Sequence, residues 1–239
     1  MTTSIDLRET KCVYINLDSA TRNKEEMENQ LNDAGFKDFE RLSARVVPPP
    51  TPEPPDNIPG CETWWNIFRG VAQSHIDILE NNDAPVLVLE DDATIDLDHF
   101  KPVLDYIPDD TDGIYLGISQ SDGRYKALDI GQDWLWMRGI FSTHAILYLS
   151  ERYKKAVIDV AKDFAYNKNI ATDLGWCSLQ DHFNIITPHK PYFYQGDARE
   201  SLNKWENLTR TPLRITEELP PPSNPIMQVP DGPQGTMQL

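Results

Sequence analysis

The sequence predicts a layered α/β domain in which helices flank a central sheet. Three observations carry this prediction: a length of 239 residues, a hydrophobic content of 39%, and short apolar runs that alternate with helical periodicities. The length suits one large domain, and the hydrophobic content is sufficient for a sizeable core. Strands that alternate with helices along the chain are typical of a sheet covered by helices.

The N-terminal half contains two units in which these patterns are clear. The apolar run 13–17 predicts a buried strand, and residues 21–34 predict a helix with Met27 and Leu31 on one face, stopped by Gly35. Apolar residues at helical spacings of three and four predict a second helix through Trp64, Phe68, Val71, His75 and Ile78. The run 86–89, which follows Pro85, predicts a second buried strand.

The C-terminal half continues the alternation. Residues 114–118 and 145–149 predict strands, and residues 151–166 and 178–186 predict helices. In a sheet of this kind, ligands gather at the carboxyl ends of the strands.

Prolines define the limits of the domain. Fourteen of the 19 prolines fall in two segments, 48–59 and 212–233, which can form neither regular helix nor central strand. We expect 48–59 to be an extended surface loop of the kind that often serves as a lid or binding loop. We therefore predict one domain over residues 1–208, patterned from about residue 10, and a proline-rich extended or disordered tail over 209–239.

Charge and cysteine content exclude several classes of protein. Lys and Arg number 22 against 38 Asp and Glu, a net charge of −16, which disfavours nucleic-acid binding because the field repels polyanions. No apolar run reaches 18 residues and the N-terminus lacks the pattern of a secretory signal, so we expect no membrane span and no export. Three widely separated cysteines, Cys12, Cys61 and Cys177, favour reduced thiols in the cytoplasm.

Three carboxylates follow the predicted strand 86–89 directly: Glu90, Asp91 and Asp92. They should emerge at the sheet edge, where Mg²⁺ or Mn²⁺ typically takes one or two protein carboxylates while waters and substrate phosphates complete its coordination. In an extended segment Glu90 and Asp92 would point to one side and Asp91 to the other. The alternative is that Asp92, Thr94 or Asp96 caps a helix suggested by Leu97, Phe100, Val103 and Leu104.

Further motifs accompany this acidic cluster in a fixed order. They are Ile15-Asn16-Leu17-Asp18 followed by Arg22, Ser74-His75, Leu89-Glu90-Asp91-Asp92, Thr143-His144-Ala145, and a later Asp173. In this order, over about residues 12–201, the chain resembles family 25 glycosyltransferases, the group that includes lipooligosaccharide galactosyltransferases and the domains that galactosylate collagen hydroxylysine. Three departures from the family concern the acceptor more than the donor. The proline-rich insert is long, and Cys61 lies thirteen residues ahead of Ser74 where the family has a nearer Gly-Cys. The basic segments expected toward the acceptor side are also few.

The resemblance implies a GT-A type fold, which is a Rossmann-like mixed sheet flanked by helices, and an inverting metal-dependent hexosyltransferase. Its donor would be a nucleotide sugar, expected to be UDP-linked, and its cofactor Mn²⁺ or Mg²⁺ on Asp91 and Asp92. Donor binding would fall to Asn16, Leu17, Asp18, Arg22, Ser74, His75, Glu90 and His144. The acceptor would be a hydroxyl of a saccharide, a hydroxylated side chain or a hydroxylated nucleobase.

Inversion requires a base that takes the proton of the acceptor hydroxyl. Asp173 is the first candidate for this base and Asp181 the second. Structural roles stay open beside the functional ones. His75 and His144 suit buried, hydrogen-bonded core histidines, and Asp173 suits a cap on the turn that follows it. Asp18 and Arg22 suit an N-cap and an ordinary helix cation.

Two other functional classes also fit the acidic cluster. One is a non-catalytic module of the same fold that binds Ca²⁺ or a partner. The other is a metal-dependent hydrolase, which would need a second ligand cluster, with Asp181-His182 as the candidate. A nucleic-acid acceptor would need a local cationic patch, for which the candidates are Arg124, Lys126, Arg138, Lys154 and Lys155.

Overall fold

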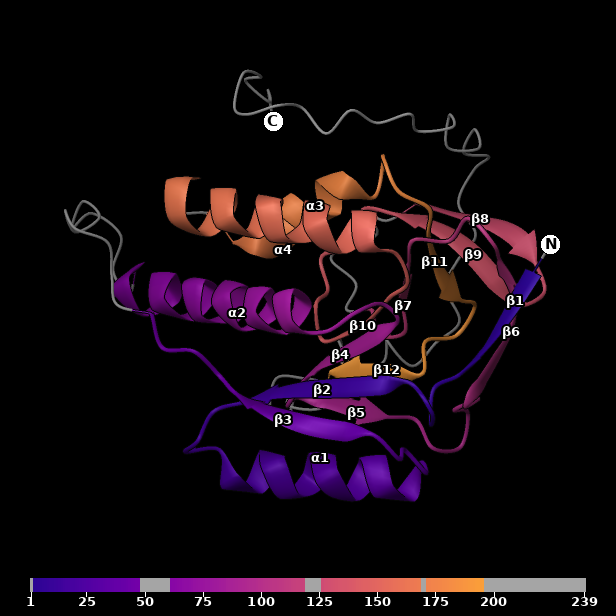
Figure 1. Cartoon of the computed structure of the whole chain (residues 1–239), viewed down its shortest axis with the longest axis horizontal. Coiled ribbons are helices and arrows are strands. Elements are labelled where there is room, and N and C mark those ends of the chain that lie inside the picture. Colours follow the sequence, from indigo (N-terminus) through magenta and orange to yellow (C-terminus); the bar gives the residue numbers. More distant parts are fainter. Residues whose placement is uncertain (1, 48–60, 119–125, 169–170, 196–239) are drawn as a thin grey trace.

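The computed structural model describes residues 2–47, 61–118, 126–168 and 171–195, with the backbone alone for 61–67. It forms an eight-stranded mixed sheet in the order β3-β2-β4-β10-β7-β11-β9-β8, with helices on both faces (Figure 1). This confirms the predicted α/β class, with a mixed central sheet flanked by helices in a single domain.

The elements have the following bounds. The main sheet contains β2 (Lys11–Asn16), β3 (Phe39–Ser43), β4 (Val86–Glu90), β7 (Gly113–Tyr115), β8 (Lys126–Gly131), β9 (Trp134–Arg138), β10 (Ala145–Tyr148) and β11 (Ile185–Pro188). Two small sheets pair β1 (Thr2–Asp6) with β6 (Val103–Pro108) and β5 (Ala93–Ile95) with β12 (Phe193–Gln195). The helices are α1 (Thr21–Asp33), α2 (Cys61–Asn81), α3 (Glu151–Lys162), which runs into the π-helix η1 (Asp163–Lys168), and α4 (Thr172–Leu179).

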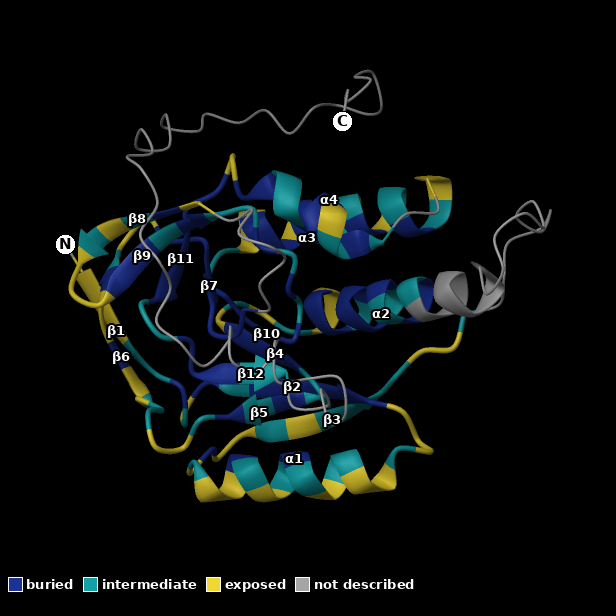
Figure 2. Cartoon of the chain, turned by 180° about the vertical axis from the view of Figure 1, so that it is seen from behind, coloured by how far each residue is buried: buried dark blue, intermediate teal, exposed yellow. Residues whose placement is uncertain are grey.

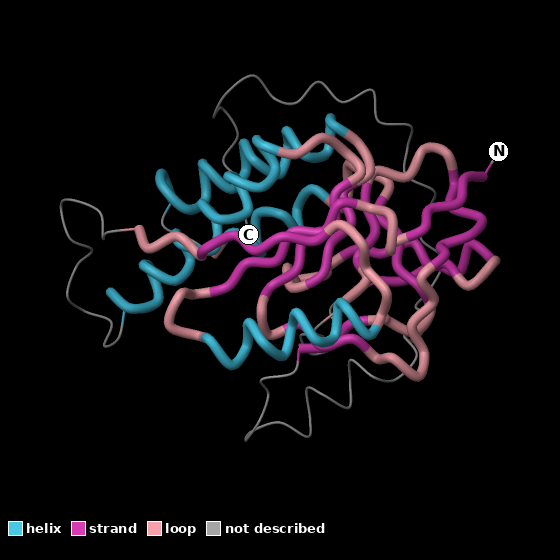
Figure 3. The backbone as a smooth tube through the Cα atoms, turned by 60° about the horizontal axis from the view of Figure 1, so that its bottom comes forward, coloured by secondary structure: helices cyan, strands magenta, loops and turns pink. Residues whose placement is uncertain are grey.

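The strand order reverses direction at β2. This strand is parallel to both of its neighbours, with β3 on one side and β4 on the other. The connection through α1 covers one face of the sheet, whereas α2 lies on the opposite face with α3 and α4 (Figures 1 and 3). In α/β sheets, such a reversal opens a crevice outside the carboxyl ends of the strands, and ligands bind there.

Alternation along the central strands builds two cores. In β2, Val13 and Ile15 pack on the α2 side, while Cys12 and Tyr14 belong to the core that includes α1. The same period of two in β4 sends Val88 to the first core and Leu89 to the second. The strands at the centre of the sheet are therefore buried on both faces (Figure 2), which explains why they read as continuous apolar runs.

The helices predicted for 21–34, through Trp64 to Ile78 and in the first part of 151–166 are confirmed, as are the strands predicted for 13–17, 86–89 and 145–149. The helix predicted for 178–186 is wrong, because α4 ends at Leu179 and residues 185–188 form β11. Ile185 and Ile186 fill the position between β7 and β9, where sheet pairing outweighs the local helical pattern.

A helix through residues 97–104 is also contradicted. Residues 93–95 form β5, and residues 103–108 form β6, which pairs with β1 at the N-terminus. Pro102 lies inside the supposed helix, and β1 was not predicted. The alternative in which Asp92, Thr94 or Asp96 caps a helix is therefore wrong.

Several predictions fall outside the described residues. They concern the proline-rich loop 48–59, the tail 209–239 and the side chain of Arg124. None of the helices that the structure describes is long and apolar enough to cross a membrane.

Candidate functional site

A cleft of about 380 Å³ opens at the carboxyl ends of β2, β3 and β4, at the reversal of strand order. Its apolar lining includes Leu17 after β2, Val46 after β3 and Val71 on α2. Its polar lining includes Asn16, Ser74, and the three acids Glu90, Asp91 and Asp92. The cleft thus brings together four of the eight predicted donor-binding residues, Asn16, Leu17, Ser74 and Glu90, and both predicted metal ligands, although they come from three separate segments.

Glu90, the last residue of β4, connects this cleft to the helical face. Its Oε1 accepts a hydrogen bond from Thr143 Oγ1 and lies 3.3 Å from Nε2 of the buried His75 on α2. The ring of His75 packs edge-on against Trp176 at 4.9 Å. Burial alone would raise the pKa of Glu90, but the interactions with His75, Thr143 and His144 lower it below the usual value. Glu90 is therefore held as a carboxylate.

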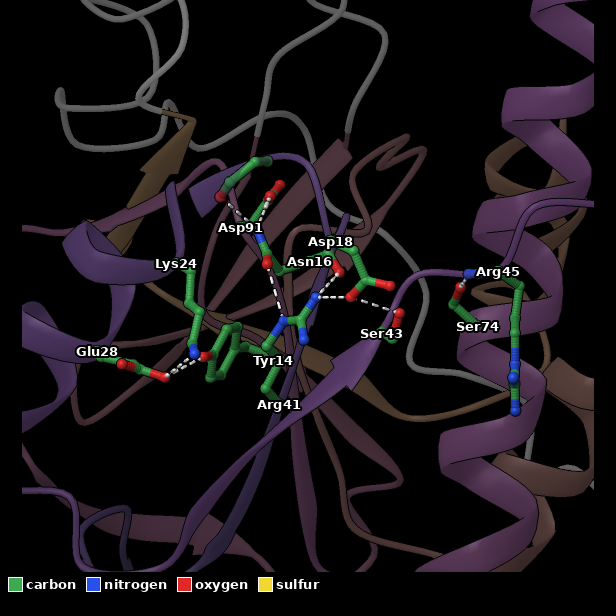
Figure 4. A network of polar contacts seen from close by, with 11 residues as sticks. Tyr14, Asn16, Asp18, Lys24, Glu28, Arg41, Ser43, Arg45, Ser74 and Asp91 are labelled. Atoms are coloured by element: carbon green, nitrogen blue, oxygen red, sulfur yellow. Dashed lines mark hydrogen bonds and ion pairs between the residues drawn. The ribbon is translucent and has the colours of Figure 1, made fainter. Parts of the chain in front are cut away.

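Asp91 faces the other side of the sheet. Its Oδ2 accepts a hydrogen bond of 2.6 Å from Asn16 Nδ2, and the Oδ1 of Asn16 accepts one of 2.9 Å from Arg41 Nε (Figure 4). Arg41 also forms an ion pair with Asp18, which accepts a hydrogen bond of 2.9 Å from Ser43. Burial, together with the negative charge of Glu90, raises the pKa of Asp91. Asn16 therefore orients Asp91, and Arg41 orients Asn16.

Asp92 carries the least satisfied carboxylate of the cluster. Its Oδ2 accepts a hydrogen bond of 2.9 Å from Gln195 Nε2 at the end of β12, whereas its buried Oδ1 has no hydrogen-bond partner among the described residues. Burial and the charges of Glu90 and Asp91 raise the pKa of Asp92 to about 7. A buried carboxylate oxygen without a hydrogen-bond partner lowers the stability of the fold, so a ligand that binds this oxygen would stabilise the protein.

The predicted alternation of the three acids does not extend to Asp92. Residues 91–92 form a turn between β4 and β5, so Asp92 does not follow the period of two that holds within a strand. Asp92 consequently meets Gln195 of β12.

His144 lies at the start of β10, beside the cluster. Its backbone oxygen accepts a hydrogen bond of 2.9 Å from the Glu90 amide, as the antiparallel pairing of β10 with β4 requires. The buried ring rests against Gly117, where an added Cβ would lie 2.6 Å from the His144 Cδ2. Burial lowers the pKa of His144 to about 4, so the ring is neutral, and its Nε2 has no partner among the described residues.

Ser74 hydrogen-bonds to two of the segments that line the cleft. Its Oγ donates to the Gly70 oxygen at 2.7 Å and accepts from the Arg45 amide at 2.9 Å, which ties α2 to the segment that follows β3. The role that the structure shows for Ser74 is to position Arg45 and Val46, rather than to present its hydroxyl to the cleft.

The remaining predicted residues lie further out. Arg22 is on the surface of α1, where its side chain is 72% exposed and pairs with Glu26 at 2.7 Å. Asp18 does not cap α1, because the N-cap is Ala20. Asp181 is 74% exposed and lies 3.7 Å from Arg138 on β9.

Asp173 lies in the first turn of α4. Its Oδ1 accepts a 2.8 Å hydrogen bond from the Leu174 amide, so part of its role is to stabilise this turn. Burial, with a contribution from the negative charge of Glu90, raises the pKa of Asp173. Asp173 therefore lies within the electrostatic reach of the acidic cluster.

Two residues that the sequence did not reveal complete the site, Arg41 and Gln195. In the sequence, Arg41 is one of several cations between the first two helices, and no pattern distinguishes it from the others. No pattern in the sequence points to Gln195 either. Both reach the cluster through strand pairing, since β3 adjoins β2 and β12 adjoins β5.

No family model and no curated protein matches the chain. Within the described part of the chain, no group of three or more His, Cys, Asp or Glu side chains is arranged to hold a metal ion. Asp91 and Asp92 instead fit an ion that takes one or two protein carboxylates and fills its other positions with water and ligand phosphates. The Oδ1 of Asp92, which has no partner among the described residues, is the candidate atom for such a contact.

Proposed function

We propose that the chain is a metal-dependent inverting glycosyltransferase of the GT-A type, which moves a hexose from a UDP-linked donor to an acceptor hydroxyl. One observation supports this above all: Asp92, whose buried Oδ1 has no partner among the described residues, lines the cleft at the point where the strand order reverses. Such crevices are where α/β sheets bind nucleotides.

The lining of the cleft suits the two parts of a nucleotide sugar. Leu17 and Val46 are exposed apolar side chains that can cover the faces of a base, and the three acids line the same cleft. A diphosphate is repelled by carboxylates in a protein of net charge −16, so Mn²⁺ or Mg²⁺ on Asp91 and Asp92 would supply the positive charge that neutralises the leaving group. Asn16 and Gln195 hold these two carboxylates in place.

Asp173 is favoured over Asp181 as the base. A general base must lie near the acceptor hydroxyl and have a pKa closer to neutrality than a free carboxylate. Asp173 is partly buried, and its pKa is raised by this burial and by the negative charge of Glu90. Asp181 is exposed and forms an ion pair with Arg138. Asp173 would accept the proton from the acceptor hydroxyl as its oxygen attacks the anomeric carbon.

The described cations favour a saccharide or a hydroxylated side chain over a nucleobase as acceptor. Lys154 is buried and bonds to Glu151 and to the backbone oxygen of Asn82. Lys126 and Arg138 are opposite each other in the β8–β9 pair, and Arg138 lies 3.7 Å from Asp181, whereas Lys155 is on α3. Carboxylates therefore offset Lys154 and Arg138, two of the four candidate cations that the structure describes, which disfavours a polyanionic acceptor. A cytoplasmic location is part of the same proposal.

Calorimetry with UDP tests the proposal directly. We expect UDP to bind in the presence of Mn²⁺ and to bind much more weakly without it, and we expect slow hydrolysis of a UDP-hexose with the metal. Asp92→Asn should abolish both properties, whereas Lys37→Met, at an exposed position near the N-terminal strand pair, should leave both unchanged. Metal binding that is indifferent to nucleotide would instead indicate a non-catalytic module.

A further inference from the structure

A second cleft, of about 360 Å³, lies away from the acidic cluster, between β6, the turn that joins β8 to β9, and the segment before β12. Its inner surface includes the buried rings of Trp134 and Tyr192. Tyr192 precedes Gln195, which binds Asp92, by three residues, a distance of about 10 Å in an extended chain. The two clefts share no lining residue.

The rim of this cleft is polar and carries planar groups. Asp105 and Asp133 provide carboxylates, Gln132 an amide and Lys101 an ammonium group, which donates a 2.9 Å hydrogen bond to Asp133. Tyr106 adds an aromatic ring that is 57% exposed.

The backbone around the cleft is unusual. Among the residues that the structure describes, three other than glycine have positive φ angles, and all three line this cleft: Tyr106 at 59°, Gln132 at 57° and Asp133 at 68°. The hairpin turn explains the last two, because tight hairpins favour this conformation. Tyr106 lies at a register shift between β1 and β6, where glycine or asparagine would be less strained.

We infer that this cleft is a second binding site, for a neutral saccharide. An exposed aromatic ring packs on the apolar face of a sugar, while carboxylate, amide and ammonium groups bind its hydroxyls. Two carboxylates against one ammonium group disfavour an anionic ligand such as a phosphate, and the polar rim disfavours an apolar one. The strained backbone at Tyr106 is consistent with selection for its ring rather than for stability.

The inference does not require the chain to transfer a sugar. If it does, the cleft would hold a saccharide unit of the acceptor at a distance from the acceptor hydroxyl that reacts near Asp92. The binding test is therefore carried out without nucleotide or metal, so its result is independent of the donor reaction.

Saturation-transfer NMR on the full chain, with methyl β-galactoside, lactose, maltose and cellobiose as probes and glycerol as the control polyol, tests the inference. We expect at least one sugar to receive saturation while glycerol does not. Tyr106→Gly should weaken that binding about tenfold, which corresponds to a loss of about 1.4 kcal/mol, and should leave the fold as stable or more stable. Asp133→Asn should weaken binding as well.

Two control variants make the result specific. Asp92→Asn and Lys155→Ala, the latter at an exposed position on α3, should retain the saccharide signal. The inference is overturned if no probe sugar binds, if glycerol gives the same signal as the sugars, or if binding survives in both Tyr106→Gly and Asp133→Asn. Loss of donor hydrolysis in Asp92→Asn with retained sugar binding would support the two sites separately.

Discussion

Nε2 of His75 lies 3.3 Å from Oε1 of Glu90, and this pair joins the helical layer to the end of the central strand β4. His75 is completely buried, and its Nδ1 has no partner among the described residues, so the contact with Glu90 is the polar interaction that the structure shows for the ring. Glu90 in turn neighbours the two acids of the proposed metal site. A change at His75 should therefore alter both stability and the cleft.

The pair should be energetically coupled. We expect His75→Ala to lower the free energy of unfolding by about 2 kcal/mol, because it opens a cavity and leaves a largely buried carboxylate with one fewer partner. A double-mutant cycle with Glu90→Gln, measured by urea unfolding, should give a coupling energy of about 1 kcal/mol or more. The surface pair Lys162 and Glu80, at 2.7 Å, serves as the control and should give less. Equal coupling in the two cycles would contradict the assigned role of His75.

Asp92→Asn should stabilise the metal-free protein. The folded pKa of about 7 lies above the ordinary value, so the folded state binds the extra proton. Stability is therefore lost as pH rises from about 4 to 7, and above pH 7 the charged carboxylate carries its full cost. The asparagine variant should exceed the parent by about 1–3 kcal/mol at pH 8, and the difference should vanish near pH 4.

Thermal unfolding across this pH range, without divalent metal, measures the effect of Asp92→Asn. Asp98→Asn, at an exposed carboxylate, is the matched control and should show little change. If Asp92→Asn is less stable than the parent at pH 8, the ionised Asp92 carboxylate stabilises the metal-free fold, and the prediction is wrong.

Gly117 should tolerate a side chain only when His144 is removed. Gly117→Ala alone should cost about 2 kcal/mol, because its Cβ would collide with the imidazole ring. In a His144→Ala background the same substitution should cost less, since the collision with the ring is removed and the Ala145 Cβ, at 3.0 Å, is the remaining close atom. Urea unfolding of the two single variants and the double variant provides the measurement. Equal costs in both backgrounds would show that the ring does not occupy this space.

Arg41 should affect ligand binding without touching the ligand. Its guanidinium group holds the Asn16 side chain, which holds Asp91, so Arg41→Met should weaken Mn²⁺-dependent UDP binding about tenfold or more. Arg41→Lys should rescue little, because an ammonium group cannot reproduce the fork that bonds both Asn16 and Asp18. Titration calorimetry distinguishes these variants, with Lys37→Met as the control. Unchanged affinity in Arg41→Met would exclude a positioning role.

The local sequence pattern predicts part of the candidate site, namely where the acids lie, but not which residues they bind. The apolar run of β4 ends in acids, and from this alone the position of Glu90 to Asp92 at the sheet edge could be predicted. The partners of these acids could not. Asn16, Thr143 and Gln195 lie 75, 53 and 103 residues from the acids they bind, and only strand order brings them together.

Local sequence also failed where two elements compete for one segment. Residues 97–104 and 178–186 carry helical spacing, yet strands form at 103–108 and 185–188 because β1, β7 and β9 offer hydrogen-bonding edges there.

The sequence by itself determined the α/β class, the central strands and the place of the acidic cluster, because these follow from hydrophobic period and from where each apolar run ends. The tertiary structure alone decided that Asp91 is paired through Asn16 to Arg41 while one oxygen of Asp92 has no partner among the described residues. Hydrogen bonding depends on distances between segments far apart in the chain, and those distances are set by strand order and packing rather than by any local pattern.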